Sequence, residues 1–139
     1  MKKQPAKKPD HDMSKDDLER LAEFRYQLRR YLRFSEEVTR RGGITPLQYQ
    51  LMLQIKGFPG RETATVGELA ERLQAKHHGV VSLISRCEAA ALVKRSISRS
   101  DRRRVDVQLT KKGDKCLQQL AGLHRGELLS LQGQLTRPI

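Results

Sequence analysis

The chain has 139 residues, of which 28 are Lys or Arg and 16 are Asp or Glu, so its formal net charge is +12. A single domain of this length buries roughly two thirds of its unfolded surface without needing disulfides or a structural metal. No stretch approaches the ~20 apolar residues of a transmembrane helix, and the basic N-terminus is followed by no apolar segment of a signal peptide. These features exclude a membrane span, and we expect a cytoplasmic protein.

The positive charge is concentrated in residues 94–112, where the only acids are Asp101 and Asp106. Arginine, which predominates there, contacts phosphates and base edges through a planar fork, so a nucleic-acid partner is favoured over a plain solvated surface. The basic residues of this segment are Lys94, Arg95, Arg99, Arg102, Arg103, Arg104, Lys111 and Lys112.

The first elements are a flexible arm and a long helix. Residues 1–13 mix Lys, Pro and Asp without periodicity, which is typical of a flexible basic arm. From Ser14, which begins a sequence like a capping box, apolar residues recur at three- and four-residue steps. This pattern predicts a helix to about Arg41, ended by Gly42 and Gly43 in positive-φ positions.

Two further helices begin at capping boxes. The sequence Thr45-Pro46-Leu47-Gln48 predicts the start of a second helix, which Gly57-Phe58-Pro59-Gly60 ends. The sequence Thr65-Val66-Gly67-Glu68 predicts a short third helix over residues 66–73.

A fourth helix is predicted after residues 74–76, with one apolar and one polar side. The inward side consists of Val80, Leu83, Ile84 and Cys87. The opposite side is small, polar or basic over its first two turns and contains no acid there, as a helix in the DNA major groove requires. It consists of His77, His78, Gly79, Ser82, Ser85 and Arg86.

The apolar period then changes to about two, over residues 92–98 and 104–109, which predicts a β-hairpin with its tip at residues 99–103. Thr110 is a candidate cap for a last, leucine-rich helix. Gly122, Gly126 and Gly133 are expected to bend or interrupt that helix.

This order of elements is that of a winged helix-turn-helix, and the residues resemble the MarR (multiple antibiotic resistance regulator) family of bacterial transcription factors over roughly residues 18–135. The resemblance rests on Thr45-Pro46-Leu47-Gln48, residues 66–73 and Leu92-Val93-Lys94-Arg95. Its most specific part is Asp101-Arg102-Arg103 followed by Leu109-Thr110-Lys111-Lys112-Gly113.

The resemblance implies a mainly α fold with a small β-hairpin wing, in which a winged helix-turn-helix domain is joined to a helical dimerisation region. After the arm, residues 14–42 would form an N-terminal dimerisation helix, residues 43–113 the DNA-binding domain, and residues 114–139 C-terminal dimerisation helices. It also implies a homodimer that binds a palindromic operator in double-stranded DNA.

The resemblance implies two sets of DNA contacts. The recognition helix would present Lys76, His77, His78, Gly79, Ser82 and Arg86 to the major groove. In the wing, Arg103 would enter the minor groove, where negative potential is concentrated, with Asp101 fixing its direction. The remaining basic residues would contact phosphates, which position a protein without reading sequence. These are Arg95, Arg99, Arg102, Arg104, Lys111 and Lys112.

Two departures from the family pattern affect the recognition helix. The family usually has Leu and Gly where this chain has Cys87 and Ala91. Because Ala adopts a left-handed conformation less readily than Gly, we expect a tighter turn or a longer helix there. The His77-His78 pair replaces the more common small hydroxyl or charged residues.

Several site assignments remain open at the sequence level. The two histidines are interpreted as DNA contacts, with an ordinary surface or a metal site as alternatives. If they contact DNA, acidification would strengthen binding. Cys87 and Cys116 are expected to pack, with redox control as the alternative. Many members of the family bind small aromatic acids or other lipophilic ligands in a cleft between the dimerisation and DNA-binding regions. Here Arg25, Tyr26, Arg29 and Tyr49 would line such a cleft and pair with an anionic effector, or they would simply belong to a helix surface and interface.

The sequence contains no HExxH, phosphate-binding glycine loop or nucleophile elbow, and the two cysteines have neither CxxC nor metal-ligand spacing. We therefore expect no enzyme, metal or cofactor. The favoured function is a homodimeric, sequence-specific transcriptional repressor. The alternative is a sequence-independent nucleoid-type or RNA-associated binder, whose affinity would fall steeply with salt.

Overall fold

The computed structural model describes residues 12–98 and 100–131. Most of the predicted arm, together with Arg99 and Gly133, lies outside the described residues. In the described part, no helix is both long and apolar enough to cross a membrane. The fold class is confirmed, since the described residues form five α-helices and one small antiparallel sheet.

The first helix, α1, spans Lys15–Arg41 as predicted. Its N-terminus is capped by the Ser14 hydroxyl, which accepts a hydrogen bond from the Asp17 backbone N–H at 3.1 Å. Of the two glycines after the helix, Gly43 has a positive φ of 79°, whereas Gly42 remains in the right-handed region.

The helices α2 (Pro46–Lys56) and α3 (Val66–Leu73) both begin with reciprocal capping boxes, as predicted. In α3, the Thr65 hydroxyl accepts from the Glu68 backbone N–H, and the Glu68 carboxylate accepts from the Thr65 N–H. The strand β1 (Ala64–Thr65) was not predicted. Two residues are too few to show an alternating pattern.

The fourth helix, α4, spans His77–Ala89, and its end corrects one expectation. The expected tighter turn or longer helix is wrong, because Ala91 itself takes the left-handed conformation, with φ at 59°. The Ala91 N–H donates to the Glu88 carbonyl, and the Leu92 N–H donates to the Cys87 carbonyl, both at 2.9 Å. This pair of bonds is a Schellman motif with Ala in place of the usual Gly.

The predicted hairpin consists of β2 (Val93–Ile97) and β3 (Val105–Leu109), which pair antiparallel from Val93 with Leu109 to Ile97 with Val105. The sheet order is β1-β3-β2.

The helix α5 spans Lys111–Ser130 and is capped by Thr110. The expected interruption at Gly122 and Gly126 is wrong, because α5 continues through both. A glycine costs a helix only about 1 kcal/mol, and packing against α1 offsets it.

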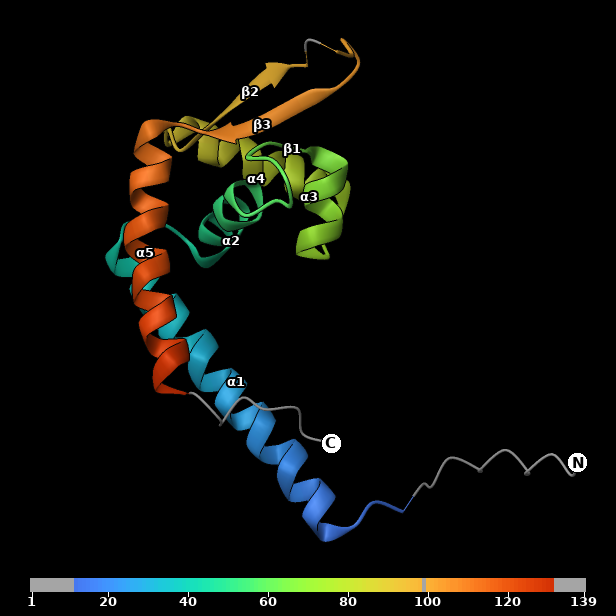
Figure 1. Ribbon diagram of the computed structural model, residues 1–139, viewed down its shortest axis with the longest axis vertical. Coiled ribbons are helices and arrows are strands. Elements are labelled where there is room, and N and C mark those ends of the chain that lie inside the picture. Colours follow the sequence, from blue (N-terminus) through green and yellow to red (C-terminus); the bar gives the residue numbers. More distant parts are fainter. Residues whose placement is uncertain (1–11, 99, 132–139) are drawn as a thin grey trace, which may run out of the picture.

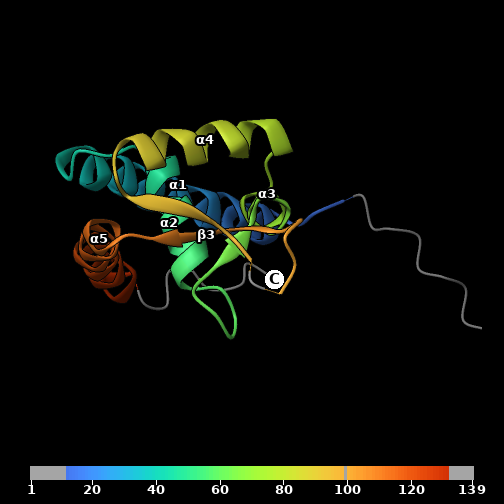
Figure 2. The ribbon, with the colours of Figure 1, turned by 90° about the horizontal axis from the view of Figure 1, so that it is seen from above.

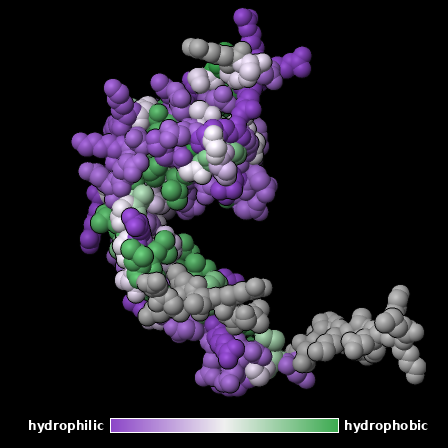
Figure 3. Space-filling model, in the orientation of Figure 1, coloured by the Kyte–Doolittle hydropathy of each residue, from purple (hydrophilic) through white to green (hydrophobic). Residues whose placement is uncertain are grey.

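The elements form two regions, which we name the lobe and the stem (Figure 1). The lobe consists of α2, α3, α4 and the sheet, and the stem consists of α1 and α5, which runs back along α1. Seen from above, α4 lies along the hairpin and α5 stands at the end of the hairpin (Figure 2). Apolar side chains gather over α5 and the adjoining part of α1, whereas the lobe surface is mainly hydrophilic (Figure 3).

The core lies mainly inside the lobe and contains the inward side of α4 as predicted. Val80, Leu83, Ile84 and Cys87 are all buried there, against apolar residues of α2, α3 and the hairpin. The opposite side of α4 is therefore the side that faces solvent.

Candidate nucleic-acid interface

The exposed side of α4 carries every residue predicted for the recognition helix. Its first turn contains no acid, and among the described residues no side chain caps its N-terminus. The first N–H groups of this helix are thus available to an anion such as a DNA phosphate, which the helix dipole also favours. The predicted contact residues are all exposed, and they are the N-cap Lys76 and, on the helix itself, His77, His78, Gly79, Ser82 and Arg86.

A tight turn joins α3 to α4. Gln74 takes φ of 51°, and the Ala75 N–H donates to the Ala70 carbonyl at 3.0 Å, which closes the end of α3. The turn therefore fixes the angle at which α4 leaves α3, as a helix-turn-helix requires.

The wing tip is shaped by Asp101. Its carboxylate accepts from the Arg103 backbone N–H at 2.9 Å, and its carbonyl accepts from the Arg104 N–H at 3.0 Å. The resemblance implied that Asp101 would direct the Arg103 side chain, whereas the structure shows it holding the Arg103 backbone. The side chains of Arg102 and Arg103 are exposed.

Two of the arginines assigned to phosphates are engaged within the protein. The Arg95 guanidinium donates to the Glu88 carboxylate at 2.8 Å and to the Ser85 hydroxyl at 3.1 Å. The Arg104 guanidinium donates to the Asp106 carboxylate at 2.9 Å. The structure therefore separates these two from Arg102 and Arg103, a distinction that the sequence did not make.

The lysines after the hairpin are both exposed at the start of α5. The Lys112 ammonium donates to the Ala90 carbonyl at 3.0 Å, where it faces the end of α4.

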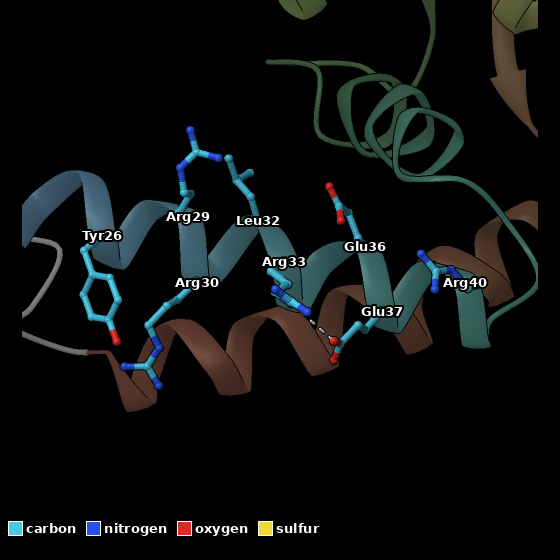
Figure 4. A pocket seen from close by; sticks show the side chains of 8 residues that line it. All are labelled: Tyr26, Arg29, Arg30, Leu32, Arg33, Glu36, Glu37 and Arg40. Carbon is cyan, nitrogen blue, oxygen red and sulfur yellow. Dashed lines mark ion pairs between the residues drawn. The ribbon is translucent and has the colours of Figure 1, made fainter.

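The four residues predicted for an effector site are not brought together. A hollow of about 540 Å³ lies along α1, and its lining includes Tyr26 and Arg29 but neither Arg25 nor Tyr49 (Figure 4). Tyr49 is 5% exposed in the core, where burial raises the pKa of its phenol to about 12. All residues that line the hollow come from α1, namely Tyr26, Arg29, Arg30, Leu32, Arg33, Glu36, Glu37 and Arg40.

A buried histidine that the sequence analysis did not single out joins the stem to the lobe. Both ring nitrogens of His124 lie 2.7 Å from a hydrogen-bond partner, the Leu120 carbonyl and the Ser35 hydroxyl. Its ring stacks on Tyr49, with the centroids 4.3 Å apart. The residues come from α1, α2 and α5, so their proximity is set by the tertiary fold and leaves no local sequence signal.

The cysteines lie in different environments. Cys87 is fully buried, and burial raises the pKa of its thiol to about 11. Burial also raises the pKa of the half-buried Cys116 thiol, while the nearby Lys112 lowers it. Within residues 12–98 and 100–131, no three His, Cys, Asp or Glu side chains are grouped closely enough to hold a metal ion.

Comparison with known proteins finds a family model and a curated relative that are similar to part of the chain. The sequence model of the MarR family matches residues 42–104. The HTH-type transcriptional repressor MdtR of Bacillus subtilis (strain 168) is 33% identical over 72 residues, which are 52% of this chain and 44% of MdtR. The chain thus aligns with less than half of the length of that curated relative.

Solved structures share the fold over most of the chain. The MarR family regulator AbsC of Streptomyces coelicolor has a TM-score of 0.75 at 20% identity, covering 92% of this chain and 86% of AbsC. A mutant MepR of S. aureus bound to an oligodeoxyribonucleotide has a TM-score of 0.64 at 20% identity, covering 91% and 87%. Over residues 42–104 the chain is therefore similar to MarR family proteins, and its winged-helix fold is shared with solved structures of that family.

Proposed function

We propose that this protein is a sequence-specific DNA-binding transcriptional regulator, which acts as a homodimeric repressor on a pseudo-palindromic operator. The observation that carries the proposal is the exposed side of α4, whose first two turns contain no acid, beside a wing whose tip carries two exposed arginines. The row suits the major groove, and an arginine at the tip suits the narrow, more negative minor groove.

The charge of the chain supports the same partner. A net charge of +12 attracts a polyanion and steers its approach. The uncapped N-terminus of α4 adds a phosphate site that fixes the register of the helix in the groove. Direct contacts from α4 would then read the base edges.

The relatives support the repressor part of the proposal. MdtR is named as a transcriptional repressor, and the MepR structure contains bound DNA. A repressor of this kind blocks transcription by occupying the operator.

The stem supports the homodimer. It carries large apolar side chains that the described residues leave exposed, on the patch seen in Figure 3. A second copy of the stem would cover them, with residues 14–42 and 114–139 as the dimerisation segments. Two-fold symmetry then places the half-sites about one helical turn, roughly 10 bp, apart. Outside the hollow on α1, the exposed apolar residues of the stem are Leu18, Leu123, Leu128 and Leu129.

The hollow on α1 supports a small aromatic or anionic effector that releases the DNA. Four arginines and Tyr26 line it (Figure 4). Glu37 pairs with Arg33 at 3.8 Å, so the Glu37 carboxylate does not neutralise the other three arginines of the hollow. Calorimetric titration with benzoate tests this part, because Arg29→Ala should weaken the binding whereas Arg20→Ala, outside the hollow, should not. Equal binding by the two variants would contradict it.

Selection from a random library of 30-bp duplexes tests the main proposal. The purified protein is mixed with the library at physiological salt with excess competitor, and the retained duplexes are sequenced. A shared palindromic motif is expected. Uniform retention that disappears as salt rises would instead support the sequence-independent binder.

The wing is tested on the selected motif. Arg103→Ala should weaken specific binding by about 1–3 kcal/mol, the usual value of a good base contact. Glu127→Ala, on α5, is the matched control and should leave the affinity unchanged. A dimer that binds the motif equally well without Arg103 would show that the wing assignment is wrong.

A further inference from the structure

The strand β2 is held against α4 by hydrogen bonds between Arg95 and Glu88. Glu88 accepts two hydrogen bonds from Arg95: one from its guanidinium at 2.8 Å, the other from its backbone N–H at 3.3 Å. A single carboxylate on the last turns of α4 thus holds both the side chain and the main chain of one strand residue.

The other face of the same guanidinium reaches further along α4. It donates to the Ser85 hydroxyl at 3.1 Å and lies 3.4 Å from the Val81 carbonyl. Arg95 therefore spans about two turns of the helix, and its side chain is only 29% exposed. A guanidinium with this many partners is fixed in direction, because its planar fork is used on several sides.

A second arginine fastens the opposite side of the hairpin to α3. The Arg104 guanidinium donates to Asp106 at 2.9 Å and lies 3.6 Å from the Glu68 carboxylate, which also pairs with Arg61. Glu68 is itself fixed, because it accepts from the Thr65 backbone N–H at 2.9 Å in the capping box.

The two fastenings have a common consequence for the wing. Arg95 lies within β2, Arg104 immediately precedes β3, and the exposed arginines of the tip lie beyond both. Both helices of the helix-turn-helix are thus tied to the wing, so that a displacement of the tip relative to α4 has to break charged hydrogen bonds.

We propose that Arg95 and Glu88 are positioning residues, which fix the wing relative to α4 so that both can contact DNA at once. The inference rests on the proposed function and changes the role of Arg95 within it. Arg95 does not serve as a phosphate contact, because its guanidinium would have to leave three partners in α4 to reach the DNA backbone. Arg95 affects the affinity for DNA indirectly, by holding the wing so that Arg102 and Arg103 at its tip can contact the DNA.

The proposal can be tested by whether removing the negative charge of Glu88 strengthens or weakens DNA binding. Glu88→Gln removes a negative charge from the DNA-binding lobe, so electrostatics alone predicts tighter binding to any duplex. If Glu88 positions the wing, the same change weakens binding to the duplex from the selection by roughly 3–30-fold, the range for residues that act without touching the ligand. Binding to a scrambled duplex of equal length should not weaken.

The matched control is Glu71→Gln, which removes an exposed acid of α3; within the described part of the chain, its carboxylate accepts a hydrogen bond only from the neighbouring Gln74 side chain. This variant should bind both duplexes as tightly as the wild type or slightly more tightly. Arg95→Gln should weaken specific binding as much as Glu88→Gln, and the double variant should lose no more than either single one.

Hydrogen exchange of the free protein provides a readout that requires no DNA. Glu88→Gln should speed amide exchange in residues 93–97 and leave the stem unchanged. If the wild type shows no preferred duplex, the proposed function fails. The exchange result still tests whether the Glu88–Arg95 contact holds β2 against α4. Unchanged exchange, or binding of Glu88→Gln to the selected duplex as tight as that of Glu71→Gln, would overturn the positioning role.

Discussion

Gly113 shows how a single backbone contact decides the identity of a residue. A Cβ on Gly113 would lie 2.0 Å from the carbonyl oxygen of Leu92. That oxygen also accepts from the Thr110 N–H at 3.0 Å, so it cannot move without breaking the link between the hairpin and α5. We expect Gly113→Ala to lower the free energy of unfolding by about 2–4 kcal/mol, measured by urea denaturation.

The same helix contains the control for this prediction. A Cβ on the exposed Gly122 would meet no atom within 4 Å. Gly122→Ala should therefore stabilise the protein by about 1 kcal/mol through helix propensity alone. Equal stability of Gly113→Ala and the wild type would show that the start of α5 can move away from Leu92.

Ala91 is a residue whose backbone conformation suits glycine. Its φ of 59° costs an L-residue about 1–2 kcal/mol, a strain that glycine would not have. Glycine also makes the unfolded chain more flexible, and this entropy cancels part of the gain. We expect Ala91→Gly to raise the free energy of unfolding by about 0.5–1 kcal/mol. Thermal denaturation should show a higher Tm for this variant.

The neighbouring Ala89 is the control, because it is exposed but lies within α4. Ala89→Gly should destabilise the protein by about 1 kcal/mol or less. If both glycine variants shifted the Tm in the same direction, the strain assigned to Ala91 would be refuted.

At the scale of elements, helix starts could be predicted because their chemistry is local. Ser14, Thr45, Thr65 and Thr110 each accept from a backbone N–H three residues on, and that spacing is visible in the sequence. The uninterrupted course of α5 through Gly122 was not predictable in this way, because it depends on packing against α1.

The same distinction applies to the candidate site. The exposed row of α4 could be predicted from helical periodicity, because that pattern lies entirely within the sequence of one helix. The roles of Arg95 and Arg104 depend on acids in other elements, Glu88 and Glu68, and no periodicity relates a strand residue to the helix it packs on. The run of arginines indicated a nucleic-acid partner, which stays a prediction, but it could not separate the arginines that pair within the protein from the exposed ones.

The packing of α4 predicts an alkaline transition. The pKa of the Cys87 thiol is raised from 9.0 to about 11 by burial. The unfolded chain thus forms the thiolate more easily than the folded one, and stability that is complete below pH 9 is lost as the pH rises through 11. By pH 10 the loss from this residue should be about 1 kcal/mol.

Urea denaturation at pH 8 and pH 10 measures this loss. Between pH 8 and pH 10, the free energy of unfolding should fall by about 1 kcal/mol less in Cys87→Ala than in the wild type. This difference does not depend on how stable the variant is at pH 8. Cys116→Ala, which leaves Cys87 in place, is the control and should retain the contribution of Cys87. The same pH dependence in wild type and Cys87→Ala would contradict the assignment.

At the scale of the whole molecule, the buried His124 contributes to the joint between the lobe and the stem. It bonds Ser35 of α1 while its ring stacks on Tyr49 of α2, so one side chain of α5 contacts both the other stem helix and the first helix of the lobe. In a dimer built through the stem, the distance between the two α4 helices would depend on this joint. The spacing of the proposed half-sites would therefore depend on the stem as well as on the lobe.

The dimer itself gives the last prediction. Leu123 and Leu129 of α5 are 55% and 57% exposed, and burying such a side chain is worth about 1.5–3 kcal/mol, counted twice across a two-fold interface. We expect light scattering to show a dimer of the 15.9 kDa chain, and Leu123→Glu to yield a monomer that no longer binds the selected duplex, because an unpaired carboxylate would be buried twice.

Ile97→Glu is the matched control, since Ile97 is 67% exposed on the hairpin, away from the stem. This variant places the same charge on an equally exposed apolar position and should remain a dimer. If Leu123→Glu also remained a dimer, the apolar surface of α5 would not be the interface. If both variants became monomers, the interface would have to include the wing, and the wing could not then be free to enter a groove.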